Sequence, residues 1–200
     1  MKKPLWVWWG RRLSLLFFVL AVLAFGHSGY VYVKAWVSQH LLSHAWQRSL
    51  AQGKAIKPWN WADTYPVGRL LVPRLNQDQI LLQGTSGRVL AFGPGHQAGT
   101  PLPGESGNVV VAGHRDTHFA FLAQLKAGDL TYLQGADGVL VGYRIVSTQV
   151  ISAREVKWLE DEPLDMLTLI TCYPFEGASP QTDQRYLVRA VRVPDTLASI

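Results

Sequence analysis

The sequence predicts a mainly β domain, a closed barrel or a sandwich, with one or two brief helices. Short runs rich in Val, Ile, Leu, Tyr and Thr recur along the chain, and turn-forming Gly, Pro, Asp and Asn residues separate them. Many short strands with few helices are typical of barrels and sandwiches. The predicted strands lie within residues 69–75, 79–84, 108–114, 130–134, 139–151, 167–173 and 185–193.

The best candidate for a helix inside this domain is residues 119–128, FAFLAQLKAG. Phe121, Leu122 and Leu125 have the spacing of one buried helical face, so we expect them to pack inward. The chain shows no internal repeat and no tract of low complexity. The β pattern therefore predicts a single domain over residues 67–200.

The N-terminal region predicts a membrane anchor. Residues 1–12 carry four basic side chains, and residues 13–33 lack Asp, Glu, Lys and Arg over roughly the 20 residues that span a bilayer. A secretory signal peptide is the alternative, because a basic start followed by an apolar run also fits one. We favour the anchor because the apolar stretch continues into Tyr30, Tyr32 and Trp36, which suit a membrane interface.

The charges beside this segment predict its orientation. Basic residues precede it, so the positive-inside tendency places the N-terminus in the cytoplasm and the domain outside. Residues 34–66 then form a membrane-proximal region. Apolar side chains from Trp36 to Leu50 lie near one helical face, and Gly53 is a plausible end of that helix.

The net charge of +5 originates in the N-terminal region. Six of the 19 Lys and Arg residues precede residue 54, whereas no Asp or Glu occurs before Asp63. From residue 54 onward, 13 basic residues stand against 14 acidic ones, a net charge of −1. The basic balance therefore indicates membrane topology and not nucleic acid as a partner.

The chain contains a single cysteine, Cys172, so it forms no internal disulfide even though the domain is predicted to be exported. A cysteine that follows an apolar run such as LTLIT is, taken alone, most often a small core residue. An unpaired thiol outside the cytoplasm is nevertheless a liability unless it is buried or used. Cys172 is therefore either core or a nucleophile.

Three residues of complementary chemistry stand at the ends of three predicted strands: His114, Cys172 and Arg185. A nucleophilic thiol needs a base or cation beside it, and the charge that develops on an attacked carbonyl needs donors. Taken singly, the histidine suits a turn and the arginine a solvated strand end. Together they predict an active site, because strand ends hold groups firmly yet leave them open to substrate.

A rival set shares one member, since His114, Asp116 and His118 could be metal ligands. In an extended chain, however, two histidines four residues apart lie about 13 Å apart, and this segment follows a strand. No second cluster of ligands completes such a site. We therefore expect no metal and no other cofactor, and we expect His96 in its Gly-rich loop to serve the turn.

Three stretches resemble the sortase family. Residues 168–172, TLITC, fit the family's TLxTC signature; residues 103–115, PGESGNVVVAGHR, resemble the segment that leads to its catalytic histidine; and residues 185–191, RYLVRAV, resemble the strand that begins with its catalytic arginine. The order His, Cys, Arg and the N-terminal anchor are also those of the family. The resemblance runs from about Val67 to Val193.

This resemblance implies an eight-stranded β-barrel and a cysteine transpeptidase. Such an enzyme cuts a C-terminal sorting signal, often of LPxTG type, from an exported protein and passes the acyl group to an amine acceptor in the cell wall, a lipid or a protein. Cys172 would be the nucleophile, His114 the acid and base, and Arg185 the oxyanion or substrate clamp. A cysteine peptidase that uses water, and a non-catalytic β-barrel scaffold with a core cysteine, are the alternatives.

The compact layout resembles the single-anchor sortases of Gram-negative bacteria, which implies an inner-membrane protein with its domain in the periplasm. Residues 151–165 would lie beside the substrate-recognition loop. Further expected substrate-binding residues are Thr171 and the acidic cluster Glu160, Asp161 and Glu162, although a charge run is usually a solvated face. The connector 57–66 lacks the Asp-Pro-aromatic order of the lid in pilin-building sortases.

Overall fold

The computed structural model describes residues 13–15, 17–18, 37–159, 164–176 and 182–194. The chain divides into two units, Met1–His40 and Leu41–Ile200. In the first unit, residues 13–15, 17–18 and 37–40 are helical. Within the described ranges, no helix combines the length and the apolar character needed to cross a membrane. Apart from residues 13–15 and 17–18, the predicted anchor 13–33 lies outside the described residues, as does the basic segment 1–12.

The second unit is built on eight strands that close into a barrel in the order β1-β2-β3-β4-β7-β8-β6-β5. This confirms the predicted mainly β, eight-stranded fold. The strands are β1 (Pro66–Val72), β2 (Gln77–Gln83), β3 (Gly95–His96), β4 (Asn108–Ala112), β5 (Leu130–Gln134), β6 (Leu140–Ser152), β7 (Met166–Tyr173) and β8 (Gln184–Arg192). The short helices are α2 (Gly87–Leu90) and the 3-10 turns η1 (Pro73–Leu75), η2 (Ala120–Gln124) and η3 (Lys157–Leu159).

One structural difference concerns the predicted helix at 119–128. The structure has only the short 3-10 helix η2 there, and Leu125 already has extended backbone angles. The chain turns at this point because the Lys126 N–H donates a hydrogen bond to Asp129 Oδ2 over 2.8 Å, which leads the backbone into β5. Phe121, Leu122 and Leu125 still pack into the core as predicted.

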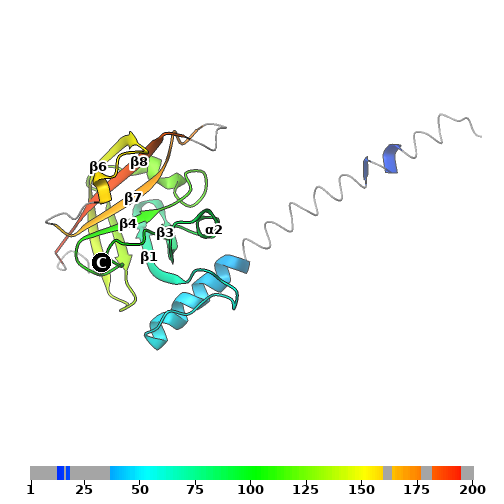
Figure 1. Cartoon of the computed structure of the whole chain (residues 1–200), viewed down its shortest axis with the longest axis horizontal. Coiled ribbons are helices and arrows are strands. Elements are labelled where there is room, and N and C mark those ends of the chain that lie inside the picture. The colour runs from blue at the N-terminus through cyan, green and yellow to red at the C-terminus, as the bar shows by residue number, and fades with distance from the viewer. Residues whose placement is uncertain (1–12, 16, 19–36, 160–163, 177–181, 195–200) are drawn as a thin grey trace, which may run out of the picture. The chain divides into compact units, whose positions relative to one another are not determined.

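Most of the barrel wall is antiparallel, but β4 and β7 pair in parallel. Parallel pairs are usually covered on both faces, and their strands are then apolar throughout. The sequences NVVVA and MLTLITCY fit this rule, since β4 is buried through Val111 and β7 through Thr171. Figure 1 shows β4, β7 and β8 as neighbours in one wall of the barrel.

Two apolar clusters cover the two faces of this wall. Inside the barrel, side chains such as Val111, Leu169 and Val188 belong to the main core. On the outer face lies a smaller cluster, which we call the outer strip: Ala112, Ile151, Trp158, Ile170 and Leu187. Because side chains alternate along a strand, membership of these clusters tells which residues face outward.

A helix precedes the barrel, as the apolar spacing predicted. Residues 41–52 are helical, and Leu42, Ala45 and Trp46 are buried. Leu42 packs against Leu82 and Val89 on the barrel side. This element therefore has the fold expected of the membrane-proximal helix, whose relation to a membrane stays a prediction.

Candidate active site

Cys172 is the second-last residue of β7. The residues of β7 before it are buried, and Cys172 itself is half-buried. In the antiparallel pair of β7 and β8, its direct partner is Arg185. Side chains of directly opposed residues in such a pair lie on the same face, with Cβ atoms about 5 Å apart. The strand pairing alone therefore places the Arg185 side chain beside the thiol.

His114 reaches the other side of Cys172 by the pairing of β4 with β7. In this parallel pair, Ala112 lies opposite Ile170, an offset of 58 residues. The Gly113 N–H continues the ladder by donating to the Ile170 carbonyl over 3.1 Å. His114 follows two residues after Ala112. If the offset of 58 residues continues, its neighbour on β7 is Cys172.

Strand alternation places Cys172 and Arg185 on the outer face of the barrel wall, and His114 follows the end of the neighbouring strand β4. Ile170 and Leu187 belong to the outer strip, whereas Leu169 and Val188 belong to the inner core. Positions two residues further along the same strands share the same face. Cys172 and Arg185 thus lie directly beyond the apolar pair of Ile170 and Leu187, and His114, two residues past Ala112, completes what we call the row.

The backbone before His114 is fixed by contacts from two sides. Thr171 is 3% exposed, and its hydroxyl donates to the Gly113 carbonyl over 2.7 Å. The His114 carbonyl in turn accepts a hydrogen bond from the Phe119 N–H over 2.9 Å. The exposed imidazole of His114 therefore stands on a backbone whose polar groups are held in place.

Gly113 is needed for this arrangement because the Phe119 ring lies against its backbone. A Cβ atom at position 113 would lie 2.6 Å from Phe119 Cγ. Real side-chain atoms do not approach so closely, and Phe119 is fully buried, with no room to retreat. The turn that follows β4 therefore closes over a glycine.

The guanidinium of Arg185 is half-buried and oriented by the loop before β8. Its Nη1 donates to the carbonyl oxygens of Thr182 at 2.7 Å and Gln184 at 2.9 Å. Both bonds use the same nitrogen, and a guanidinium carries three more N–H donors on Nε and Nη2. The side chain is thus oriented at one end and retains donor capacity at the other.

The outer strip is anchored by a buried polar pair. Thr168 donates to Asn108 Oδ1 over 2.8 Å, and Asn108 Nδ2 donates to the Trp158 carbonyl over 2.8 Å. These bonds fasten η3 to the wall formed by β4 and β7. An ordered apolar surface therefore borders the row of catalytic candidates.

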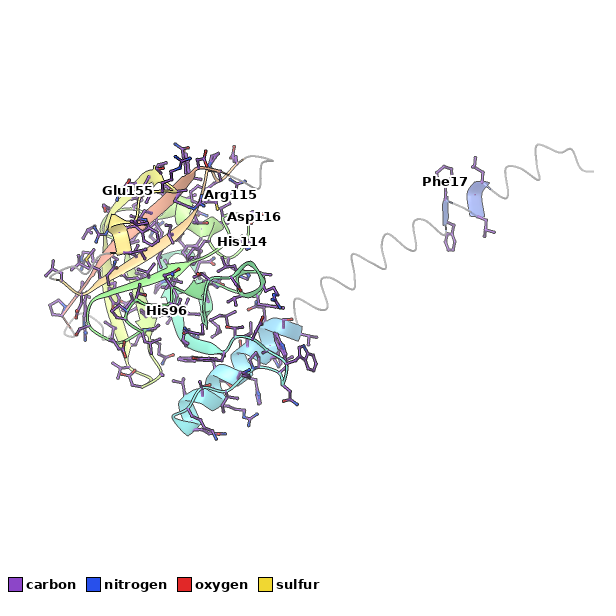
Figure 2. The ribbon with its side chains drawn as sticks, in the orientation of Figure 1. Phe17, His96, His114, Arg115, Asp116 and Glu155 are labelled. Carbon is purple, nitrogen blue, oxygen red and sulfur yellow. The ribbon has the colours of Figure 1, made fainter. Side chains whose placement is uncertain are left out.

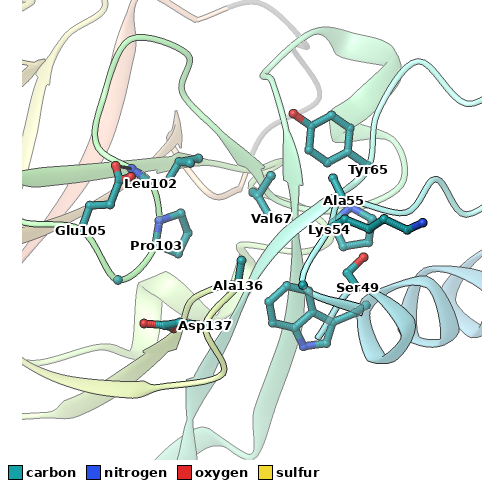
Figure 3. Close-up of a pocket in the computed structure, with 14 residues that line it drawn as sticks. Ser49, Lys54, Ala55, Tyr65, Val67, Leu102, Pro103, Glu105, Ala136 and Asp137 are labelled. Atoms are coloured by element: carbon teal, nitrogen blue, oxygen red, sulfur yellow. Dashed lines mark hydrogen bonds between the residues drawn. The ribbon is translucent and has the colours of Figure 1, made fainter. Parts of the chain in front are cut away.

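Two cavities among the described residues lie away from this row. One of about 420 Å³ lies between residues 46–55, the start of β1 and the turns at 102–105 and 136–137, as Figure 3 shows. Another, of about 530 Å³, lies beside β5 and β6. None of the three catalytic candidates lines either cavity. His114 is exposed and Cys172 and Arg185 are half-buried, so the row is accessible from the surface.

Among the other predicted substrate-binding residues, Thr171 alone belongs to the described part of the chain. Thr171 is buried and bonded to the backbone, while Glu160, Asp161 and Glu162 lie outside the described residues. His96 is 2% exposed, and its Nε2 lies 2.9 Å from the Pro101 carbonyl oxygen, so it serves its turn as expected. Figure 2 shows His96 apart from His114, Arg115 and Asp116.

The supporting residues Gly113, Phe119, Asn108 and Thr168 were not predicted from the sequence. A glycine next to a candidate catalytic residue was the one available signal, because glycine at a strand end often marks a close approach of another group. In the described ranges, no three His, Cys, Asp or Glu side chains gather closely enough to hold a metal ion.

Comparison with known proteins identifies the family of the fold. The sortase domain family matches residues 70–193. Sortase D of Bacillus subtilis is 33% identical over 129 residues, which are 63% of this chain and 63% of that protein. The chain therefore spans less than two thirds of the length of that relative.

Solved sortase structures have the same architecture. Sortase A from Corynebacterium diphtheriae is 29% identical with a TM-score of 0.60, over 67% of this chain and 63% of that one. Sortase C-1 from Actinomyces oris is 34% identical with a TM-score of 0.57, over 64% of this chain and 75% of that one. With the family match and the row of His114, Cys172 and Arg185, these likenesses show that the chain belongs to the sortase family.

Proposed function

We propose that this chain is a membrane-anchored cysteine transpeptidase that cleaves a C-terminal sorting signal of an exported protein and transfers the acyl group to an amine acceptor. The observation that carries this proposal is the row formed by Cys172 and Arg185 on the paired strands β7 and β8 and by His114, two residues beyond the end of β4. The row sets a nucleophile between a proton carrier and a cation. This is the set of groups that acyl transfer through a thioester requires.

The first half of the reaction forms the acyl-enzyme. The Cys172 thiolate attacks the scissile carbonyl carbon, and the carbonyl oxygen becomes negatively charged. When this intermediate collapses, the C–N bond breaks, and the His114 imidazolium gives its proton to the leaving amine. A thioester on Cys172 and a neutral His114 remain.

The second half reverses these steps with a new amine. Neutral His114 takes a proton from the acceptor amine as its nitrogen attacks the thioester carbon. The C–S bond then breaks, and the Cys172 thiolate and the His114 imidazolium are restored. No electrons are exchanged with any further reagent, so no cofactor is needed.

Arg185 stabilises the oxygen on which charge develops. Its Nη1 is occupied by the carbonyl groups of Thr182 and Gln184, and these bonds orient the guanidinium plane. The donors on Nε and Nη2 can bind the developing oxyanion or substrate carbonyl groups. A lysine ammonium, which is a point charge on a flexible stem, would do this less well.

The outer strip supports binding of an apolar part of the sorting signal. It lies on the same face as Cys172, one row of side chains away, and Trp158 packs on it. The acidic residues Glu160, Asp161 and Glu162 follow Trp158 in the chain and remain candidates for signal choice. Thr171 supports the site from inside the wall and is not proposed to touch the substrate.

The membrane assignment rests on the sequence. Residues 13–33 anchor the chain with its N-terminus in the cytoplasm, and the barrel acts outside, in the periplasm of a Gram-negative cell. The partners are then an exported protein with a sorting signal, an amine acceptor and the inner membrane.

The test uses the full chain in detergent with an LPxTG-type peptide series and a small amine such as triglycine. We expect a product whose mass equals the N-terminal peptide fragment joined to the amine. Cleavage that survives Cys172→Ala would contradict the proposal. Release of the free acid in the presence of amine would support the cysteine peptidase instead, and an unreactive Cys172 thiol would support the scaffold.

A further inference from the structure

The turn at residues 59–62 presents Trp61 to solvent, and the proposed reaction does not use this side chain. Trp61 is 84% exposed, the highest value among the large apolar side chains in the described ranges. The Ala62 N–H closes the turn by donating to the Trp59 carbonyl over 3.0 Å, and Ala62 itself is buried. A single exposed apolar side chain is common on protein surfaces, so the place of Trp61 in the fold decides what it means.

Two contacts fasten this turn to the region of α2. On one side, the Trp59 ring packs edge-on against Phe92, with ring centroids 5.3 Å apart. On the other side, Asp63 forms an ion pair with Arg88 of α2, in which the nearest N and O atoms are 3.5 Å apart. Phe92 in turn packs against the apolar cluster of Leu42, Leu82 and Val89. The backbone that carries Trp61 is therefore held in place.

These contacts locate the turn at the start of the helix formed by residues 41–52. Leu42 is at that start, and Figure 1 shows α2 beside the same end of the helix. The other end of the helix lies near the β5–β6 turn, since a Cβ atom at Gly138 would be 3.9 Å from Leu50 Cδ2. Leu42 and Leu50 are about 12 Å apart along a helix. Trp61 and the β5–β6 turn thus belong to opposite ends of this element.

The start of this helix is also where the chain arrives from the predicted membrane anchor. Seven residues, 34–40, separate the end of that anchor from Leu41. A chain of this length spans at most about 25 Å even when fully extended. The end of the domain that carries Trp61 is therefore kept close to the bilayer surface.

The charges at this end suit an anionic surface. No Asp or Glu precedes Asp63, whereas Lys57 lies just before the turn and is exposed. The Arg88 side chain is 87% exposed, and exposed ion pairs such as that with Asp63 are weak. Arg88 can therefore exchange the carboxylate for a lipid phosphate.

We propose that the turn 59–62 and α2 form a membrane-docking face, in which Trp61 enters the headgroup region of the bilayer and Arg88 binds anionic headgroups. The inference rests on the membrane anchor of the proposed function. An indole has an apolar body and one N–H donor, so it suits the boundary between lipid and water. Basic side chains near an anionic leaflet add electrostatic attraction. The docked face fixes how the barrel is oriented on the membrane.

The test places a fluorescent label at each end of the helix in the full chain. Trp61→Cys and the matched control Val139→Cys are made in the Cys172→Ala protein, so the introduced thiol alone takes a nitrobenzoxadiazole label. Val139 is also exposed and follows Gly138 in the β5–β6 turn. Both proteins are reconstituted in vesicles of phosphatidylethanolamine and phosphatidylglycerol, with and without a lipid that carries a nitroxide at its headgroup. We expect the nitroxide to lower the fluorescence about twofold at position 61 and by less than about a tenth at position 139, because interfacial aromatic residues lie at headgroup depth.

A charge reversal tests the part assigned to Arg88. Arg88→Glu in the labelled Trp61→Cys protein should remove most of the quenching at position 61, because the new carboxylate is repelled by phosphatidylglycerol. Arg144→Glu, which reverses an exposed charge on β6, is the control and should leave the quenching unchanged. Equal effects of the two reversals would show that Arg88 has no particular contact with the lipid.

The outcomes separate this face from the anchor and from the enzyme. If the full chain floats with the vesicles but positions 61 and 139 are quenched equally, the docking face is wrong and the anchor stands. A label at position 61 that is shielded from water yet not quenched by the nitroxide would indicate a protein partner or a second copy, and would also overturn docking. A chain that does not float with the vesicles contradicts the anchor and the docking face together. Selective quenching at position 61 would support docking even if the original protein transfers no acyl group, a result that rejects the transpeptidase alone.

Discussion

Cys172 has a proposed catalytic partner on each side, and the two partners are held in different ways. Arg185 lies inside β8, and the antiparallel ladder with β7 sets its position. His114 lies two residues beyond β4 and depends on contacts that Gly113, Thr171 and Phe119 make locally. The position of Arg185 is therefore set by the strand pairing of the barrel, whereas the position of His114 is set by local contacts of the turn after β4.

This difference predicts where the site is vulnerable. Many backbone hydrogen bonds hold β8 against β7, so the loss of one contact near Arg185 should change the rate little. The turn before His114 has few contacts, and each fixes the same short piece of backbone. Substitutions that leave the catalytic side chains intact should therefore reduce the rate more on the His114 side.

The largest effect should come from the catalytic side chains themselves. We expect His114→Ala to lower kcat about a thousandfold, because it removes the proton carrier. Arg185→Lys, which keeps the charge and loses the fork, should lower kcat about a hundredfold. Steady-state transfer of the peptide to triglycine measures both. An Arg185→Lys protein with unchanged kcat would show that guanidinium geometry is unimportant.

The next effect tests the glycine under the turn. Gly113→Ala introduces a Cβ that would meet the Phe119 ring, so the His114 backbone must shift, and we expect kcat to fall about ten- to hundredfold. Gly142→Ala is the matched control, since its Cβ would lie 2.8 Å from Val193 Cγ2 in another part of the barrel. Both proteins should lose about 1–3 kcal/mol of unfolding free energy. Equal kcat values in the two would contradict a special role for the turn.

A smaller effect tests the buried hydroxyl of Thr171. Thr171→Val leaves the Gly113 carbonyl without its donor, and Thr131→Val does the same to the Leu71 carbonyl, which the Thr131 hydroxyl reaches over 2.9 Å. Each change should cost about 1–3 kcal/mol of stability by denaturant unfolding. Only Thr171→Val should also slow catalysis, by about tenfold. Matching rate losses in both would assign the effect to general destabilisation.

The smallest effect should arise on the Arg185 side. The Thr182 hydroxyl bonds to the Tyr173 carbonyl and accepts from the Gln184 N–H at 3.0 Å, next to the arginine. We expect Thr182→Ala to change kcat by less than about threefold, because the β7–β8 ladder still sets the backbone of Arg185. A loss as large as that of Thr171→Val would remove the proposed asymmetry.

The sequence predicted the barrel well because its strands carry their own signals. Runs such as NVVVA and LTLITCY are β-branched and apolar, and their positions matched β4 and β7. β3 was not predicted, since two residues, Gly95 and His96, are too short to show any periodicity. The helix expected at 119–128 is a short 3-10 turn, because a local turn closed by the bond from the Lys126 N–H to Asp129 leads the chain out of the helical course.

The three catalytic candidates were predicted from strand ends and from family motifs, but their support was not. The bond between Thr171 and Gly113 joins residues 58 positions apart, and local patterns do not specify such pairs. Thr171 was expected to bind substrate, and the structure instead gives its hydroxyl a backbone partner inside the wall. The turn that the Phe119 N–H closes on the His114 carbonyl was also not predicted, because the segment was treated as extended.

The central claim is that Cys172 forms an acyl thioester with the sorting signal. The most direct measurement is the intact mass of the full chain after reaction with a sorting peptide in amine-free buffer, quenched with acid. We predict an added mass equal to the acyl fragment, located on Cys172 by peptide mapping and removed within seconds by added triglycine. Cleavage of the peptide with no adduct on Cys172, or the same adduct in the Cys172→Ala protein, would contradict this claim.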